Sequence, residues 1–285
     1  MNLCDMNEIK ALLARHGFHF SKSMGQNFLI RDWVPQDIAA ASGAGPGVGV
    51  LEIGPGIGPL TRELSLLADR VTAVELDESL LPILDETLAD RDNVTVIPGD
   101  IMRFDLDRVV DGEFPGLTPI VCANLPYNIT TPVLTRLLEC RRFASVTVMI
   151  QKEVAQRICA QPGTADYGAF SVLCQYYSKA EYLFDVPASC FLPAPKVTSA
   201  VIRMTAQQPP AQIEDEAFFF RVVRAAFAQR RKTLLNSLSA ALNTGLSKEA
   251  LAAALDACGL PQNVRGEKLG IPEFAALTKA LRSAP

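Results

Sequence analysis

The sequence has no long hydrophobic run, although 49% of its 285 residues are apolar. No apolar stretch approaches the roughly 20 residues that a membrane-spanning helix needs. The first ten residues include Asp5, Glu8 and Lys10, where a signal peptide would have its apolar core. We therefore expect a globular, cytoplasmic protein without a membrane partner, long enough for roughly two domains.

Cysteine pairs and histidine clusters are also missing. The seven cysteines form an odd set without a C-x-x-C pair, and His16 and His19 are the only histidines. Structural zinc sites and disulfide frameworks need several such residues at regular spacing. We therefore expect reduced thiols and no bound metal.

Basic residues are too few to make the whole surface positive, since the net charge is −4 and the pI is near 5.4. This balance argues against indiscriminate nucleic-acid binding. Two stretches nevertheless contain bases and no acid. Residues 10–31 have four basic residues, and residues 217–248 have six, namely Arg221, Arg224, Arg230, Arg231, Lys232 and Lys248.

Residues 48–150 alternate short apolar runs with amphipathic segments. The pattern predicts strands at 48–53, 71–75, 94–97, 120–123 and 146–150, and helices at 60–68, 80–88 and 132–138. Two more strands are expected at 181–186 and 197–204. Such alternation is typical of an α/β fold with a parallel sheet and helices on both faces, whose ligands bind beyond the carboxyl ends of the strands.

A linker divides the chain. Residues 205–216 are poor in apolar side chains and contain Pro209-Pro210. Every later segment has a helical pattern, at 217–229, 233–242, 248–257 and 272–281, and earlier helices are expected at 7–16, 33–41 and 152–160. We therefore predict one domain at 1–205, with a basic N-terminal segment, and a small all-α domain at 206–285.

A glycine-rich turn, Glu52-Ile53-Gly54-Pro55-Gly56-Ile57-Gly58, follows the strand at 48–53. Glycines let the backbone approach a ligand closely. The spacing is G-x-G-x-G, which disfavours a NAD-dependent oxidoreductase with its G-x-G-x-x-G motif. Glu75, about 20 positions later, could accept hydrogen bonds from the ribose of any adenosine-bearing cofactor. Asp100 ends the third strand, where it could bind an adenine amino group or cap a helix.

Asn124-Leu125-Pro126-Tyr127-Asn128 follows the strand at 120–123. A site that alkylates a planar amine needs hydrogen-bond acceptors for the N–H groups and a flat surface for stacking. Asn124 offers an amide oxygen, Pro126 a carbonyl on a fixed backbone, and Tyr127 a ring. The residues alone leave open the alternative of a strand end followed by a proline turn and a helix cap.

Together these residues resemble the class I S-adenosylmethionine-dependent methyltransferases, and residues 124–127 resemble their N6-adenine branch. Further motifs, between residues 22 and 277, are similar to the bacterial small-subunit ribosomal RNA adenine dimethyltransferases; they lie at 25–29, 151–154, 167–168, 191–197, 227–233 and 265–269. The resemblance implies a Rossmann-like, mostly parallel seven-stranded sheet with helices on both faces, plus a small all-α C-terminal domain.

The resemblance also implies S-adenosyl-L-methionine as the cofactor, and two adjacent adenosines near the 3′ end of 16S rRNA, in an immature small subunit, as the substrate. Asn124 and the Pro126 carbonyl would touch the amine, while Tyr127 and Phe191 would sandwich the flipped adenine. Without the resemblance, Phe191 could equally be a core aromatic. Cofactor contacts are implied for Gln26, Asn27, Leu29, Gly54, Gly56, Glu75, Asp100, Ile101 and Asn124. The enzyme is expected to be a monomer.

Basic side chains supply the candidate RNA contacts: Lys22, Lys196, Arg221, Arg224, Arg230, Arg231 and Lys232. On an uninterrupted helix, Arg221, Arg224 and Lys232 would fall on one side. Most charged helix faces are simply solvated, but the absence of any acid across residues 217–248 favours a phosphate-facing surface.

Two other functions stay open. A macrolide-resistance enzyme that methylates N6 of adenine in 23S rRNA is the closest alternative, although the motifs at 227–233 and 265–269 argue against it. An assembly checkpoint factor that tests small-subunit maturation without methylating is an alternative from another class. Labelled cofactor offered with immature small subunits or with naked 23S rRNA distinguishes the two methyltransferases. A protein that keeps its role in assembly after methyl transfer is lost would be the checkpoint factor.

Overall fold

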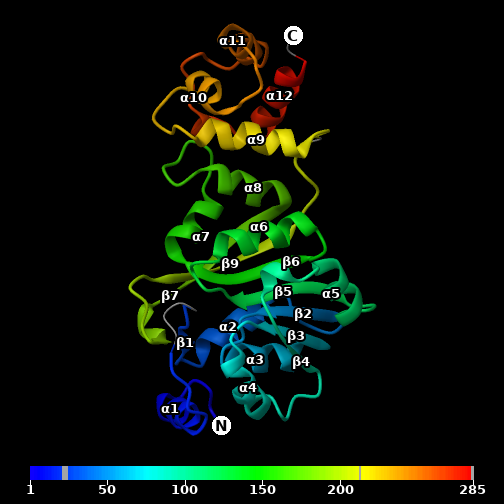
Figure 1. Ribbon diagram of the computed structural model, residues 1–285, viewed down its shortest axis with the longest axis vertical. Helices are drawn as coiled ribbons and strands as arrows, with labels where there is room; N and C mark the ends of the chain where they lie inside the picture. Colours follow the sequence, from blue (N-terminus) through cyan, green and yellow to red (C-terminus); the bar gives the residue numbers. More distant parts are fainter. Residues whose placement is uncertain (21–24, 212, 284–285) are drawn as a thin grey trace. The chain divides into compact units, whose positions relative to one another are not determined.

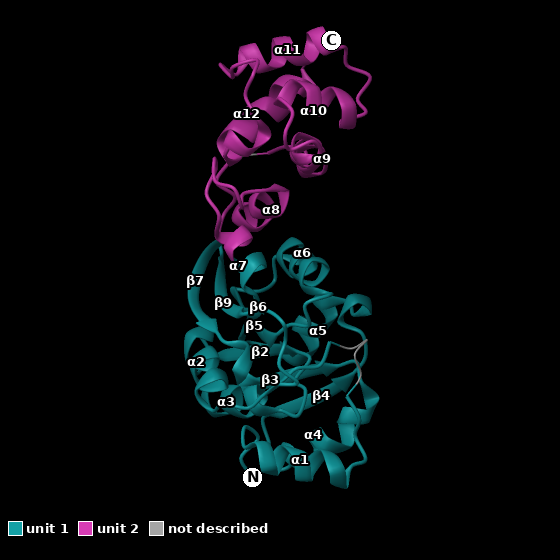
Figure 2. Ribbon diagram, turned by 90° about the vertical axis from the view of Figure 1, so that its left-hand side faces the viewer, with its two compact units in different colours: residues 1–155, 179–206 teal, residues 156–178, 207–285 magenta. Residues whose placement is uncertain are grey.

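The computed structural model describes residues 1–20, 25–211 and 213–283 (Figure 1). Lys22, a predicted RNA contact, lies outside the described residues. The chain forms two compact units, unit 1 with residues 1–155 and 179–206, and unit 2 with residues 156–178 and 207–285 (Figure 2). The boundary after residue 206 lies close to the predicted one at 205, but residues 156–178 cluster with the C-terminal helices. The division of function between the two parts stays a prediction.

Unit 1 is built on a seven-stranded sheet in the order β4-β3-β2-β5-β6-β9-β7. β2, β3, β4, β5 and β6 are joined by parallel pairing, and β9 runs antiparallel to β6. The predicted α/β fold with a mostly parallel sheet is therefore confirmed. The strands are β2 (Val48–Ile53), β3 (Arg70–Glu75), β4 (Val94–Pro98), β5 (Thr118–Asn124), β6 (Ser145–Gln151), β7 (Ser178–Val186) and β9 (Ser199–Ala206).

Helices cover both faces of this sheet. Figure 2 shows α2 and α3 on one side of the strands and α5 and α6 on the other. Strands covered on both faces have near-continuous apolar sequences, and Val50, Val71 and Val201 are accordingly fully buried. The helices of unit 1 are α1 (Met6–Arg15), α2 (Trp33–Ser42), α3 (Pro59–Leu67), α4 (Leu81–Thr87), α5 (Leu106–Glu113) and α6 (Thr130–Cys140), with short 3-10 turns η2 (Glu78–Leu80), η3 (Ile101–Arg103) and η4 (Ala188–Cys190). Helix α7 (Lys152–Cys159) begins in unit 1, and its residues from 156 onward belong to unit 2.

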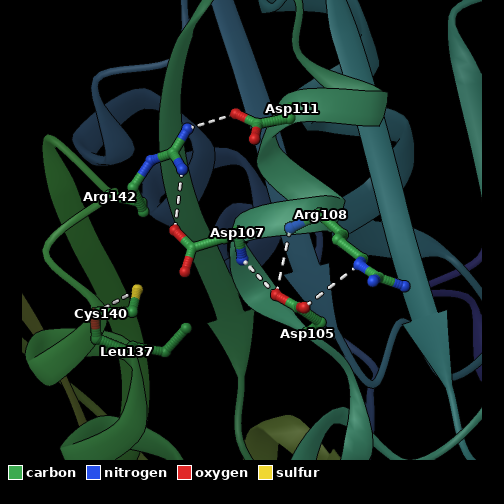
Figure 3. Close-up of polar contacts among 7 residues, drawn as sticks. All are labelled: Asp105, Asp107, Arg108, Asp111, Leu137, Cys140 and Arg142. Atoms are coloured by element: carbon green, nitrogen blue, oxygen red, sulfur yellow. Dashed lines mark hydrogen bonds and ion pairs between the residues drawn. The ribbon is translucent and has the colours of Figure 1, made fainter.

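Helix α5 has no counterpart among the predicted elements. Its N-cap is Asp105, whose carboxylate accepts hydrogen bonds from the backbone N–H groups of Asp107 and Arg108 (Figure 3). Arg142, which follows α6, binds Asp107 at 2.8 Å and Asp111 at 2.6 Å, and so fastens α5 beside α6. The cap was the available sequence signal, since aspartate is a preferred N-cap residue.

A second, two-stranded sheet was also not predicted. It joins β1 (Phe28–Leu29) to β8 (Phe191–Leu192) in antiparallel register, with Leu29 opposite Phe191. Two residues are too few to establish an alternating pattern. The pairing fixes the segment that follows residue 25 against a distant part of unit 1.

Unit 2 is helical, as predicted for the C-terminal part. Residues 156–178 belong to it because Tyr176, near the end of α8, donates its hydroxyl to Glu216 at 2.9 Å and places its ring 5.4 Å from that of Phe219. Gly266 packs on the α9 backbone, where a Cβ would lie 2.8 Å from the carbonyl oxygen of Ala226. The elements are α8 (Ala169–Tyr177), α9 (Glu216–Phe227), α10 (Leu234–Ala241), α11 (Lys248–Ala257), α12 (Ile271–Arg282) and the 3-10 turn η5 (Gly266–Lys268).

The end of α9 corrects one prediction. The helix ends at Phe227, and α10 begins at Leu234 after the N-cap Thr233. Lys232 therefore lies in the turn between two helices and does not share a helix face with Arg221 and Arg224.

Some features are absent from the described part of the chain. No helix there has both the length and the apolarity needed to cross a membrane. The seven cysteines all lie in it and are all unpaired. Among the described residues, no three His, Cys, Asp or Glu side chains are grouped so that they could hold a metal ion.

Candidate functional site

One cavity of unit 1 lies where β2, β3, β4 and β5 end. It measures about 1140 Å³ when its open mouth is included. The carboxyl ends of parallel strands meet at one edge of a sheet, which is where α/β folds bind ligands. Every residue predicted to contact the cofactor lines this cavity: Gln26, Asn27, Leu29, Gly54, Gly56, Glu75, Asp100, Ile101 and Asn124. Their contacts with a cofactor stay a prediction.

The turn after β2 depends on glycine. Gly54, Gly56 and Gly58 have φ angles of 69°, 62° and 89°, a region that residues with a side chain rarely adopt. At Gly56 a Cβ would also lie 3.3 Å from the ring of Phe28. Pro59 then starts α3, where its fixed φ suits the first helical position. The turn thus leaves bare backbone at the cavity wall.

Glu75 ends β3 and is only 6% exposed. One carboxylate oxygen accepts a hydrogen bond from the Asp77 N–H at 2.8 Å, and the other from the Gly56 N–H at 3.4 Å. Burial raises the pKa of Glu75, and these two backbone N–H groups oppose the rise. The carboxyl group is therefore held in one orientation at the cavity.

Glu52 was not predicted as a site residue, yet it lines the same cavity and is 1% exposed. Its Oε2 has no hydrogen-bond partner in the described structure. Burial raises the pKa of Glu52 to about 8; the hydroxyl of Thr61 opposes this rise, and the nearby Glu75 adds to it. A charged residue inside an otherwise apolar strand was the available sequence signal.

The described lining of the cavity is acidic. It includes three carboxyl side chains, those of Glu52, Glu75 and Asp100, and no Lys, Arg or His. The Asp100 carboxylate also caps η3, because it accepts a hydrogen bond from the Met102 N–H at 2.9 Å. Asp100 therefore caps η3, as the helix-cap interpretation predicted. The second carboxylate oxygen of Asp100 lies near the exposed side chain of Arg103.

Asn124 and Pro126 differ in how much hydrogen-bonding capacity they have left. The side chain of Asn124, at the end of β5, makes no hydrogen bond to any described residue. The Pro126 carbonyl already accepts two, from the Ile129 N–H at 3.2 Å and the Thr130 hydroxyl at 3.1 Å. A carbonyl oxygen has two lone pairs. The predicted role of Pro126 as an amine acceptor therefore requires that one of these bonds be released.

The two predicted stacking rings lie in different surroundings. Tyr127 lines the cavity, and its hydroxyl is 2.7 Å from the hydroxyl of Ser199, a fully buried residue at the start of β9. Phe191 is 3% exposed, is not among the described lining residues, and packs in the core with Leu29 and Cys190. This placement matches the core-aromatic interpretation of Phe191, and its contact with a substrate base stays a prediction.

One of the predicted RNA-binding residues, Arg230, is bonded to other residues of the protein. Within unit 2, Arg230 donates to the carbonyl oxygens of Ala165 and Tyr167, the latter at 3.3 Å, and lies 3.4 Å from Glu267. Arg230 thus fastens the loop before α8. The other described candidates, all exposed, are Lys196 in unit 1 and Arg221, Arg224, Arg231 and Lys232 in unit 2.

Comparison with known proteins adds information on the family. The family described as "Ribosomal RNA adenine dimethylase" matches residues 17–281. Ribosomal RNA small subunit methyltransferase A of Geobacillus thermodenitrificans is 49% identical over 276 residues, or 95% of this chain and 94% of the relative. The protein of the same name from Streptococcus thermophilus is 48% identical over 290 residues, or 100% of this chain and 99% of the relative.

Two solved structures are similar over most of the chain. A dimethyladenosine transferase from Plasmodium falciparum has a TM-score of 0.71 at 24% identity, with 87% of this chain and 95% of that chain covered. The 23S rRNA methyltransferase ErmE has a TM-score of 0.68 at 26% identity, with 90% of this chain and 100% of that chain covered.

Proposed function

This chain belongs to the ribosomal RNA adenine dimethylase family, whose members are methyltransferases, and from this premise we propose that it dimethylates N6 of two adjacent adenosines near the 3′ end of 16S rRNA. The target RNA is proposed from relatives named for the small subunit, which are 48–49% identical over almost their whole length. ErmE, named for 23S rRNA, is 26% identical. We propose the immature small subunit as the form in which the RNA is modified.

S-adenosyl-L-methionine is the proposed methyl donor, and the residues of the cavity fit it. Its ribose hydroxyls are hydrogen-bond donors, which suits the fixed carboxyl group of Glu75. Its ammonium and sulfonium groups are positive, which suits a lining with carboxyl oxygens as acceptors and no described base. Ile101 offers an apolar contact for the adenine beside the carboxylate of Asp100. When bound, this cofactor supplies a methyl group activated on a positively charged sulfur.

Asn124 carries the mechanistic proposal, because its amide at the end of β5 has no other hydrogen-bond partner among the described residues. Its oxygen would accept a hydrogen bond from one N–H of the target amine and turn the nitrogen lone pair toward the cavity. Positive charge develops on N6 as the new bond forms, and the oxygen dipole stabilises it. The surplus proton then leaves to water. A monomethylated amine retains one N–H, so the same contact serves the second transfer.

Tyr127 would hold the target base by stacking once the adenine has been turned out of its helix. Its ring can also stabilise the developing positive charge through a cation–π interaction. The bond between the Tyr127 and Ser199 hydroxyls fixes the ring against β9. We therefore propose that Ser199, which lies outside the Asn124–Asn128 motif, contributes to binding and orienting the base.

The test of the proposed function is methyl transfer from labelled S-adenosyl-L-methionine to two RNA substrates. Immature small subunits from cells lacking this protein should acquire two adjacent N6,N6-dimethyladenosines, read by mass spectrometry of RNase fragments. Naked 23S rRNA should acquire none. Label in 23S rRNA alone would support the macrolide-resistance alternative, and tight subunit binding without any label would support the checkpoint alternative.

The Tyr127–Ser199 bond gives a first mutational prediction. Tyr127→Phe and Ser199→Ala should each lower kcat by about three- to tenfold, the value of one lost hydrogen bond, without changing the Kd of the cofactor. The double variant should be no slower than either single variant, because both changes remove the same bond. Single-turnover transfer and calorimetric cofactor titration measure the two quantities. If the kcat reductions of the two single variants multiply in the double variant, the bond does not position the ring.

Adjacent arginines give a second prediction, because Arg230 binds carbonyl groups whereas Arg231 is exposed and has no ion-pair partner among the described residues. Arg231→Glu with Lys232→Glu should weaken subunit binding at least about tenfold through phosphate repulsion, and should leave cofactor affinity unchanged. Arg230→Ala should instead lower the thermal stability of the protein. Filter binding at two salt concentrations and thermal denaturation separate these effects. Reduced cofactor affinity in the double variant would contradict the proposed division between the two units.

A further inference from the structure

Residues 25–29, which we name the cavity strap, touch three of the turns that line the cavity. A Cβ on Gly25 would lie 3.5 Å from the side-chain oxygen of Asn128, in the turn after β5. The ring of Phe28 packs against Gly56, in the turn after β2. Gln26 donates its side-chain N–H to the carboxylate of Asp77, beyond β3, at 2.6 Å. The strap therefore contacts the turns that follow three neighbouring strands of the sheet, β5, β2 and β3.

The two ends of the strap are held differently. Its carboxyl end is fixed by backbone pairing, since Leu29 lies opposite Phe191 and the Ile30 N–H donates to the Cys190 carbonyl at 2.8 Å. Toward its amino end, the Asn27 amide donates to the Gly25 carbonyl at 2.9 Å, a bond within the strap itself. The side chain of Gln26 ties this end to the cavity wall. A bond from a neutral donor to a charged acceptor is among the stronger hydrogen bonds in proteins.

Asp77 joins the strap to the predicted ribose-binding residue. Its second carboxylate oxygen accepts hydrogen bonds from the Ser79 N–H at 3.0 Å and the Ser79 hydroxyl at 2.6 Å. Its own N–H donates to the buried carboxyl group of Glu75 at 2.8 Å. Asp77 thus caps η2, orients Glu75 through its backbone, and holds Gln26 through its side chain.

We infer that Asp77 is a positioning residue that acts through Gln26 to keep the strap closed over the bound cofactor. The inference rests on the proposed use of S-adenosyl-L-methionine. Asn27 and Leu29 of the strap line the cavity, so their contact with a ligand depends on where the strap lies. Gln26 itself, predicted from the sequence as a cofactor contact, directs its amide nitrogen to Asp77 in this structure.

Two substitutions test this role by removing the hydrogen bond between Asp77 and Gln26 while keeping the N-cap of η2. Asp77→Ser keeps a preferred N-cap residue for η2 but cannot reach Gln26. Gln26→Leu removes the donor and keeps the size of the side chain. Each should raise the Kd of S-adenosyl-L-methionine about tenfold, as expected for one charge-assisted bond, through faster dissociation in stopped-flow experiments. The double variant should equal the single variants, and kcat of Asp77→Ser at saturating cofactor should stay unchanged.

Ser79→Ala is the matched control, because it removes a hydroxyl bond to the same carboxylate without touching the strap. It should leave the cofactor dissociation rate unchanged. Unaltered dissociation in Asp77→Ser and Gln26→Leu, or multiplied effects in the double variant, would overturn the inference while leaving the proposed function intact. If the expected dissociation rates are found but 16S rRNA is not methylated, the inference about Asp77 stands and the proposed RNA target fails.

Discussion

Replacing Asn124 by alanine should lower the rate of methyl transfer at least about a hundredfold, the usual cost of removing one preorganised group that stabilises developing charge. We propose Asn124 as the critical acceptor because the Pro126 oxygen is already bonded to Ile129 and Thr130. Cofactor affinity should change far less than the rate, since Glu75 and the glycine turn are untouched. Single-turnover kinetics at saturating cofactor measures the effect directly.

Asn128→Ala is the control for this experiment. Asn128 is an exposed residue on the same turn, and its amide should affect transfer only slightly. Full activity in Asn124→Ala would refute the acceptor role and point to release of the Pro126 carbonyl. If Asn124→Ala abolishes transfer but leaves subunit affinity and the timing of subunit assembly unchanged, the checkpoint alternative gains support as an additional function.

Glu52→Gln should stabilise the unliganded protein, and most strongly in alkaline solution. The pKa of Glu52 is raised from 4.5 to about 8 in the folded protein. Between these values the unfolded chain has lost the proton that the folded protein still binds, so wild-type stability falls as the pH rises from about 4.5 to about 8. At about 1.4 kcal/mol per pKa unit, the penalty reaches at most about 5 kcal/mol. Glutamine has nearly the same shape and carries no such penalty.

Thermal denaturation of both proteins across this pH range tests the prediction. The two melting temperatures should converge below about pH 4.5, where the wild-type carboxyl group is protonated in both states, and should separate progressively up to about pH 8. A wild-type protein that is the more stable at pH 8 would mean that its carboxylate has a stabilising partner after all.

The sequence was sufficient for the sheet because its strands are buried on both faces and therefore appear as continuous apolar runs. The residues predicted to contact the cofactor also line one cavity, since motifs that end parallel strands must meet at the same edge, and their contacts with a cofactor stay a prediction. Helix α5 escaped prediction because it is short and contains Gly112. The break after Phe227 was missed because neither glycine nor proline marks it, although Thr233 was available as the next N-cap.

The remaining site residues could not be identified from sequence because their roles arise from tertiary contacts. Nothing in the local sequence distinguishes Arg230 from Arg231, yet only the former meets two carbonyl groups of the loop before α8. Asp77 and Ser199 are ordinary polar residues until the fold brings them to Gln26 and Tyr127. Phe191 had a ring that suited either a stacking surface or the core, and only its burial distinguishes the two.

The pairing of β1 with β8 has a consequence for the order in which unit 1 is completed. Phe28 lies opposite Leu192, so the contact closes a loop that contains nearly all of the sheet. Such non-local contacts form late, because the entropy of loop closure must be overcome before they stabilise anything. A chain that has been synthesised only as far as β6 contains the whole glycine turn, Glu75 and Asn124, yet lacks the partner of β1. The strap can therefore become ordered in its final place only after residue 192 has been made.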